Sequence, residues 1–230
     1  MYKLMLINTS RHIVTVTYQS GESVFCAIAE ANEKDSPAYD EGSGLDRLLL
    51  EATGLLPPAL PPADWPSEMA RTIESVLLQW HREDSGPGTV LYAGVALLKN
   101  RVHVCTAGDC RVHLVKDGQL VAVTRDHNLI DDPVEGQTID TDETLRTVYL
   151  GAVTRTVGVA PSERPPERQS WQAGGNYTVL ICSSRFHNYR APNAYLDYLM
   201  KNAGPEPSER GPRSLGIMFK IDSIAISDDM

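Results

Sequence analysis

The segment from residue 89 to residue 124 constrains the fold most, because four short apolar runs follow one another there in close succession. The runs are separated by turn-forming residues, among them Asp117-Gly118, which is a typical signal for a tight hairpin. Residues 90–98, 101–106, 111–115 and 120–123 make up the four runs. We predict a meander of neighbouring antiparallel strands over this segment.

Further strands and helices are predicted on both sides of the meander. β-branched and aromatic residues indicate antiparallel strands at 2–7, 13–18 and 23–29, another strand at 177–182, and a final pair at 215–222 and 224–226. Apolar residues with helical spacing predict helices at 45–52, from about 66 to 83, and at 194–202. We expect 125–148 to form a loop or an irregular helix.

The order of these elements indicates both the fold class and the number of domains. Strands come in blocks and do not alternate strictly with helices, which favours an α+β layered sandwich with mostly antiparallel sheets. Residues 54–66 contain five prolines and are expected to form an extended surface connection. The parts on either side are each incomplete alone, so we predict a single domain over residues 1–230.

The composition excludes several kinds of partner. The 230 residues include 30 acidic and 21 basic side chains, a formal net charge of −9, and no run of five or more Lys or Arg. An acidic surface repels phosphates and anionic lipids, so we expect neither nucleic acid nor a membrane as partner. The four cysteines lie in strand-like stretches without metal-like spacing, and no leader or membrane span is visible. We therefore expect reduced, buried thiols in a cytoplasmic protein.

Three motifs inside the meander carry a resemblance to a known family. Gly108-Asp109-Cys110-Arg111, Asp117-Gly118 and Thr124-Arg125-Asp126-His127 follow one another in this order. They resemble the G-D-S-R turn, the D-G turn and the T-x-D-H segment of PPM-type metal-dependent protein phosphatases (protein phosphatase type 2C). Segments 150–158 and 173–183 look like two later motifs of the family. The resemblance covers about residues 89–190 and implies a four-layer α-β-β-α sandwich of two mostly antiparallel sheets flanked by helices.

The resemblance also implies a site, and this sequence departs from it. The family hydrolyses phosphoserine and phosphothreonine with water bridged between two Mg or Mn ions held by carboxylates, which are the hard oxygen ligands such ions need. Glu30 stands where the family has its bridging Asp, and Asp109 is retained as a peripheral ligand. Non-acidic residues occupy three other ligand positions, at Val16, Ser184 and Ser214.

The loss of these carboxylates leads to our prediction of function. We expect a PPM-type serine/threonine phosphatase-like domain that is catalytically inactive, a pseudophosphatase acting in signalling as a binding or regulatory module, with no cofactor. Arg11 and Arg185 are candidates for holding phosphate or another anion on a protein partner, since arginine makes charge-assisted bonds to such groups. The resemblance assigns the Asp126-His127 pair a structural role in its turn.

Two alternatives remain open. The first is an active Mg- or Mn-dependent phosphatase with an atypical metal site, in which Asp35, Asp40 and Glu41 supply displaced ligands. The second is an unrelated enzyme that uses Cys110 with His103 or His113 across the hairpin, although no Cys-His spacing signature supports it. Neither partner identity nor oligomeric state follows from the sequence.

Overall fold

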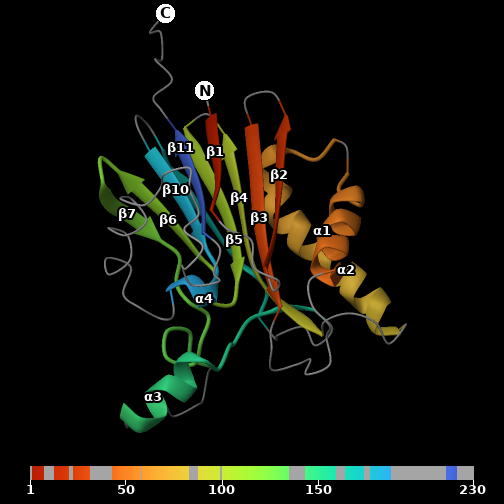
Figure 1. The fold of residues 1–230 in the computed structure, drawn as a ribbon, viewed down its shortest axis with the longest axis vertical. Coiled ribbons are helices and arrows are strands. Elements are labelled where there is room, and N and C mark those ends of the chain that lie inside the picture. Colours follow the sequence, from red (N-terminus) through yellow and green to blue (C-terminus); the bar gives the residue numbers. More distant parts are fainter. Residues whose placement is uncertain are drawn as a thin grey trace, which may run out of the picture.

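Two antiparallel sheets form the centre of the molecule (Figure 1). The structure is a computed structural model and describes residues 2–7, 13–20, 23–31, 43–57, 59–82, 88–98, 100–134, 143–158, 164–173, 177–187 and 216–221. The five-stranded sheet has the order β1 (Tyr2–Ile7), β11 (Gly216–Ile221), β10 (Tyr177–Cys182), β6 (Arg111–Lys116) and β7 (Gln119–Val123). The six-stranded sheet has the order β2 (Ile13–Ser20), β3 (Ser23–Ala31), β4 (Thr89–Leu98), β5 (Arg101–Ala107) and β9 (Glu167–Gln172), and β8 (Val157–Gly158) pairs with β4.

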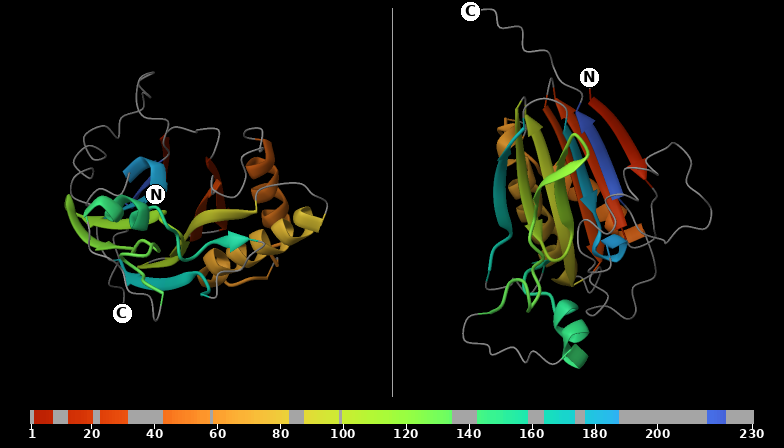
Figure 2. Two further views of the ribbon diagram at one scale, coloured as in Figure 1. Left: turned by 90° about the horizontal axis from the view of Figure 1, so that it is seen from below. Right: turned by 90° about the vertical axis from the view of Figure 1, so that its left-hand side faces the viewer.

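Helices cover the outer face of the six-stranded sheet. α1 (Ser43–Gly54), the short 3-10 helix η2 (Pro62–Asp64) and α2 (Trp65–Arg82) lie on this side. In the right-hand view of Figure 2, which looks from the left-hand side of Figure 1, α1 and α2 lie behind the strands. α3 (Glu143–Leu150) projects below the sheets in Figure 1, and α4 (Ser184–His187) lies just below the strands. The α+β fold with two antiparallel sheets and helices is confirmed. None of the helices in the described ranges combines the length and hydrophobicity that a membrane crossing requires.

The alternation of side chains along β3 separates two hydrophobic cores. Val24, Cys26 and Ile28 pack between the two sheets, whereas Phe25, Ala27 and Ala29 pack against the helices. Because successive side chains of a strand point to opposite faces, every position on β3 belongs to one core or the other. All seven residues from Val24 to Glu30 are buried, as expected of a strand covered on both faces.

The helix-side core requires a glycine on β4. Tyr92 donates its hydroxyl to the Pro66 carbonyl of α2 at 2.8 Å, so its ring lies across position 94. A Cβ on Gly94 would lie 2.1 Å from the Tyr92 hydroxyl oxygen and 3.2 Å from the Pro66 Cα. The close approach of α2 to the sheet therefore depends on the absence of a side chain at this position.

Most predicted elements are found, but the pairing of strands differs from the expectation. β1 and β2 are not antiparallel neighbours, because β1 pairs with β11 and β2 pairs with β3 in the other sheet. The meander is likewise divided, since β4–β5 belong to one sheet and β6–β7 to the other. The turn after β5 crosses between the sheets, which lets both sheets bury apolar residues in the shared core.

Several details of the prediction need correction or lie outside the described residues. β9 was not predicted, because its sequence ERQSWQ is largely polar and its residues are only partly buried. An α-helix, α3, occupies part of the segment predicted as a loop or irregular helix. The Pro-rich connection contains η2 and ends in the buried Trp65. The helix at 194–202 and the strand at 224–226 fall outside the described residues, and the single-domain assignment stays a prediction.

Candidate functional site at the ends of β3, β5 and β10

Glu30 lies near the end of β3 and is the acidic centre of the candidate site. Glu30 is two and four residues along the strand from Ile28 and Cys26, so its side chain lies on the same face and points toward the five-stranded sheet. Its Oε2 accepts hydrogen bonds from the Ser184 backbone N–H at 2.9 Å and the Ser184 hydroxyl at 3.0 Å. The Cys110 thiol approaches the same oxygen at 3.9 Å. Neutral donors from the first residue of α4 and from the β5–β6 turn thus compensate the Glu30 carboxylate, which is only 1% exposed.

A tight turn places Asp109 beside this cluster. Gly108 has a φ of +85°, and a Cβ there would lie 2.5 Å from the Leu91 side chain, so glycine is required on both counts. The adjacent Asp109 is fully buried, and neither of its carboxylate oxygens has a hydrogen-bond partner among the described residues. Burial, together with the nearby Asp126 charge, raises the pKa of Asp109 to about 8.

His187 on α4 fixes the backbone of the same turn. Its Nε2 contacts the backbone carbonyl of Asp109, and because a carbonyl can only accept, Nε2 carries the proton. Burial and the Arg111 charge lower the pKa of His187 to about 3. His187 is therefore a neutral structural donor that ties α4 to the turn.

The Asp126-His127 pair has the structural role that the resemblance implied. Arg111 donates from Nε and one guanidinium nitrogen to the two oxygens of Asp126, both at 2.6 Å, and this bidentate pair is buried. His127 contacts Glu167 of β9 at 2.9 Å through Nε2, and burial is the main cause that lowers the pKa of His127. These contacts join the loop after β7 to both sheets.

A buried carboxylate nearby joins three arginines. Asp132 contacts Arg155 at 2.7 Å, Arg164 at 3.0 Å and Arg125 at 3.4 Å. Burial tends to raise the pKa of Asp132, but the Arg155 hydrogen bond and the three positive charges outweigh it and lower the pKa to about 2. The cluster connects segment 124–134 to segments 151–158 and 164–166.

The structure shows where some of the predicted site residues lie, and the roles of all of them stay predictions. It brings Glu30 and Ser184 into direct contact and places Asp109 on the neighbouring turn. Val16 lies on β2 opposite Ala27, away from the Ile13 position that faces Glu30. The backbone of Arg185 belongs to α4, but its side chain is outside the described part. The same holds for Arg11 and Ser214, and for the displaced acids Asp35, Asp40 and Glu41, so their roles stay predictions.

A cysteine-histidine enzyme finds no support in the described geometry. Burial and the charges of Glu30 and Asp109 raise the pKa of the Cys110 thiol well above its ordinary value. Burial also lowers the pKa of His113 to about 3. Cys110 lies in the core between the sheets with Val112 and Leu114, whereas His113 alternates with these residues and points to the opposite face. A neutral thiol also lacks the thiolate that nucleophilic catalysis needs. All four cysteines are buried, as predicted, and none of them forms a disulfide with another described residue. The role of Cys110 as a donor to Glu30 was missed, and its only signal was a departure from the G-D-S-R pattern.

Comparison with known proteins confirms the resemblance. No family model matches the chain. A curated protein of Streptococcus pyogenes serotype M6, whose name describes it as of the protein phosphatase 2C type, is 30% identical over 95 residues. The match covers 41% of this chain and 38% of the relative's length.

Solved phosphatases share the fold over nearly the whole chain. The Streptococcus agalactiae serine/threonine phosphatase aligns with a TM-score of 0.67 and 12% identity over 97% of this chain and 99% of its own. The Mycobacterium tuberculosis serine/threonine phosphatase PstP aligns with a TM-score of 0.63 and 17% identity, covering 97% and 98%. The sequence match over part of the chain and the shared fold both agree with the resemblance to PPM-type phosphatases.

A third solved structure of this fold corrects the expectation that no cofactor is involved. The catalytic domain of PstP, solved in complex with two manganese ions, aligns with a TM-score of 0.60 and 15% identity over 96% of each chain. The expectation of no cofactor was therefore wrong, because a protein of this fold binds manganese. The loss of three ligand positions was not a sufficient reason to expect none.

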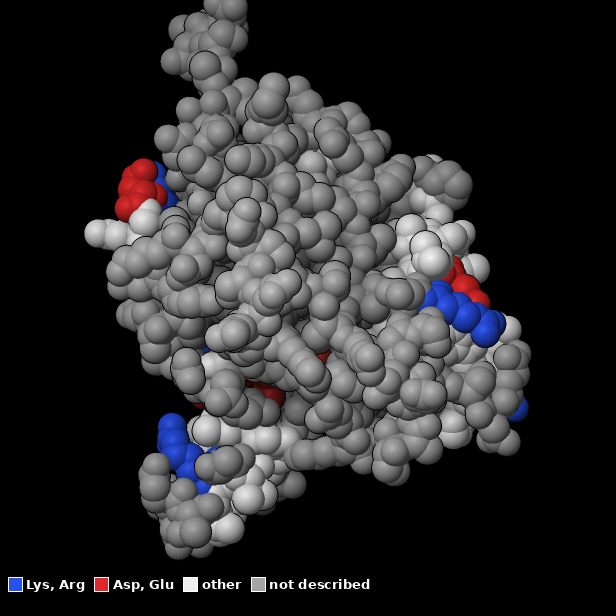
Figure 3. Space-filling model, viewed as in Figure 1, with Lys and Arg blue, Asp and Glu red and all other residues white. Residues whose placement is uncertain are grey.

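A pair of Mg or Mn ions needs several oxygen ligands close together. Within the described ranges, no group of three or more His, Cys, Asp or Glu side chains is arranged so that it could hold a metal ion. The Glu30 oxygen accepts from Ser184, whereas Asp109 offers two oxygens without hydrogen-bond partners. The described residues thus provide one suitable carboxylate and do not fit a metal pair. In Figure 3, described Asp and Glu atoms lie exposed at the left and right edges of the face, and others show only as small recessed patches near its lower centre.

Proposed function

We propose that this PPM-type serine/threonine phosphatase-like domain is a binding or regulatory module that does not turn over phosphoesters. The observation that carries the proposal is the contact between Glu30 and Ser184. By the resemblance, two metal-binding carboxylates belong at these positions, and two adjacent carboxylates repel unless cations lie between them. Here a hydroxyl and a backbone N–H satisfy the carboxylate instead, so this pair is stable without a cation.

Phosphatase activity in the presence of manganese tests this proposal. We expect wild-type protein with millimolar Mn²⁺ to hydrolyse p-nitrophenyl phosphate and a phosphothreonine peptide no faster than the Glu30→Ala variant. The variant controls for a contaminating phosphatase, because both proteins pass through the same purification. Turnover in the wild type that disappears in Glu30→Ala would refute the proposal.

The proposed partner is a protein that carries phosphate or another anionic group. Arg11 and Arg185, which flank the motif positions that the resemblance assigns to the site, would bind that group. We expect a phosphopeptide to bind in the presence of a chelator and to bind more weakly to Arg11→Ala. A cytoplasmic location and a role in signalling belong to the same proposal, and cell fractionation tests the first.

A second candidate function is an active Mg- or Mn-dependent phosphoserine/phosphothreonine phosphatase with an atypical site. It is favoured by Asp109, whose two buried oxygens have no described hydrogen-bond partner. A bound cation would supply the missing countercharge. Calorimetric titration with Mn²⁺ tests this second function. Stoichiometric Mn²⁺ binding that is lost in Asp109→Asn, found together with phosphatase turnover, would favour an active phosphatase over a binding or regulatory module.

A further inference from the structure

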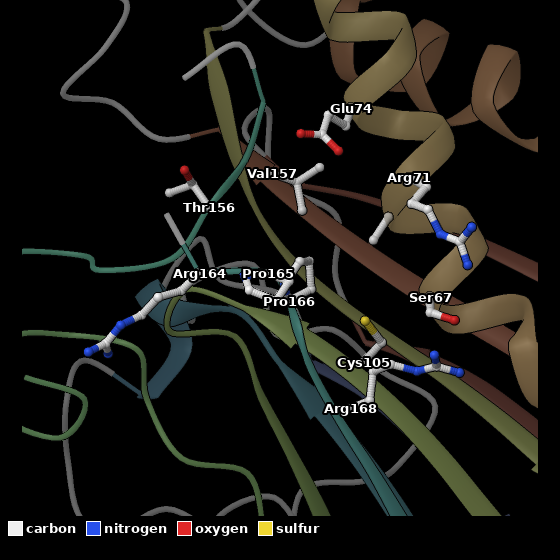
Figure 4. A pocket seen from close by; sticks show the side chains of 11 residues that line it. Ser67, Arg71, Glu74, Cys105, Thr156, Val157, Arg164, Pro165, Pro166 and Arg168 are labelled. Carbon is white, nitrogen blue, oxygen red and sulfur yellow. The ribbon is translucent and has the colours of Figure 1, made fainter. Parts of the chain in front are cut away.

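A separate cavity of about 450 Å³ lies on the opposite face of the six-stranded sheet from Glu30. α2, β5, β9 and the segments 156–157 and 164–166 enclose it, and Figure 4 shows its side chains. Cys105 at its floor belongs to the helix-side core, whereas Glu30 points into the space between the sheets. The cavity is therefore not part of the candidate phosphatase site, and its size is in the range of small-molecule sites.

Two arginines provide positive charge at one end of the cavity. Arg71 comes from α2 and Arg168 from β9, and Figure 4 shows their guanidinium groups on the same side, with Ser67 between them. The Ser67 hydroxyl donates to the Asp64 carbonyl. The third arginine of the lining, Arg164, extends away from the other two in Figure 4 and is held by the Asp132 cluster.

The existing partners of the two arginines are exchangeable. Arg71 contacts Glu68 at 3.0 Å and Arg168 contacts Asp64 at 3.1 Å, and both carboxylates lie outside the cavity lining. The arginine side chains are 65% and 60% exposed, so solvent screens these pairs and they contribute little. A phosphate dianion can accept charge-assisted bonds from both guanidinium groups and compete with such pairs.

The electrostatics of the cavity floor agree with this geometry. Burial raises the pKa of the Cys105 thiol to about 12, while the positive charges of Arg168 and Arg71 act in the opposite direction and favour an anion there. The field of both arginines thus reaches the floor. The rest of the lining is mostly apolar or uncharged, including Ala70, Val157 and Pro165, and Glu74 provides a hydrogen-bond acceptor.

We propose that this cavity binds a small phosphate monoester that carries a partly apolar, hydroxyl-bearing body. The phosphate contacts Arg71 and Arg168, the body packs against Val157 and Pro165, and its hydroxyl groups donate to Glu74. A nucleoside 5′-monophosphate has this combination of groups. The assignment does not depend on whether the Glu30 site is catalytic.

Calorimetric titration with AMP tests the proposal. We expect wild-type protein to bind AMP at low ionic strength in the presence of a chelator, and inorganic phosphate to compete with it. Adenosine, which lacks the phosphate, is expected not to bind. No AMP binding at millimolar concentration, or adenosine binding as tightly as AMP, would overturn the proposal.

Variants locate the binding site. The double variant Arg71→Gln, Arg168→Gln is expected to weaken AMP binding by at least about tenfold, whereas the control Arg146→Gln on α3 leaves it unchanged. Both substitutions of the double variant are at exposed side chains, and circular dichroism verifies that the fold is retained. AMP binding that survives in the double variant would place the nucleotide elsewhere and contradict this assignment.

Discussion

Replacing Ser184 by Asp reinstates a carboxylate at a ligand position of the family and provides a direct test of the Glu30–Ser184 contact. The Ser184 hydroxyl oxygen lies 3.0 Å from Glu30 Oε2. At an effective dielectric constant of about 20, two unit charges about 3 Å apart repel each other by roughly 5 kcal/mol. The variant therefore replaces a hydrogen bond by a strong like-charge contact when no cation is present.

Protonation limits the magnitude of this effect. A carboxyl group can take up a proton instead of bearing the repulsion, and from an ordinary Asp pKa of about 3.9 this costs about 4 kcal/mol at pH 7. We expect Ser184→Asp to lower the free energy of unfolding by about 3–4 kcal/mol at pH 7 in a chelator. The loss shrinks to about 1.5 kcal/mol at pH 5, because the proton is then easier to acquire.

Urea denaturation at the two pH values measures this loss. Ser184→Asn is the matched control, because its amide has nearly the same shape as the carboxyl group and can donate to Glu30 without a charge. Addition of Mn²⁺ should stabilise Ser184→Asp more than wild type, since a cation between two carboxylates removes their repulsion. Equal stability of the Asp and Asn variants in chelator at pH 7 would refute this account of the contact.

Three further predictions concern the residues that support the site and the core. Asp126→Asn leaves the buried Arg111 charge without its countercharge and should destabilise the fold by about 3–5 kcal/mol in urea denaturation; a loss below about 1 kcal/mol would contradict the buried ion pair. Since the pKa of Asp132 in the fold is about 2, below its ordinary value, its ionisation stabilises the fold above about pH 4. That contribution, about 1–2 kcal/mol, is lost as the pH falls through 2, and thermal melts of Asp132→Asn should lack it. Gly94→Ala should destabilise by about 1–3 kcal/mol, with a smaller effect in a Tyr92→Phe background, because the hydroxyl that the new methyl meets is then absent. Equal effects in both backgrounds would rule out that clash.

The sequence predicted the strands and the two long helices well because their signals are local. Alternating or helical spacing of apolar residues depends on a few neighbouring positions, and β3 and α2 illustrate both cases. β9 lacked such a signal, since this strand has water on one side and contributes only Trp171 to the inter-sheet core. The assignment of strands to sheets depended on the turn at Gly108, whose direction no local pattern reveals.

The candidate site could be predicted only in part for a related reason. The resemblance pointed to Glu30 and Ser184 as positions, but their contact joins residues 154 apart in sequence. The replacement of a lost ligand by a hydrogen-bond donor is a property of the packed ends of β3 and β10. The Arg71–Arg168 cavity was missed for the same reason, because its lining comes from α2, β5 and β9 together.

The four buried cysteines are distributed over different packing layers of the fold. Cys105 lies in the helix-side core, and Cys26 and Cys110 lie between the sheets. Cys182 alternates with Ile181 and therefore points to the outer face of the five-stranded sheet. Since a buried thiol reacts only when its surroundings open, the alkylation rate of each cysteine, read by mass spectrometry, reports the local opening of one layer. The native chain thus contains its own set of probes for the order in which its layers separate.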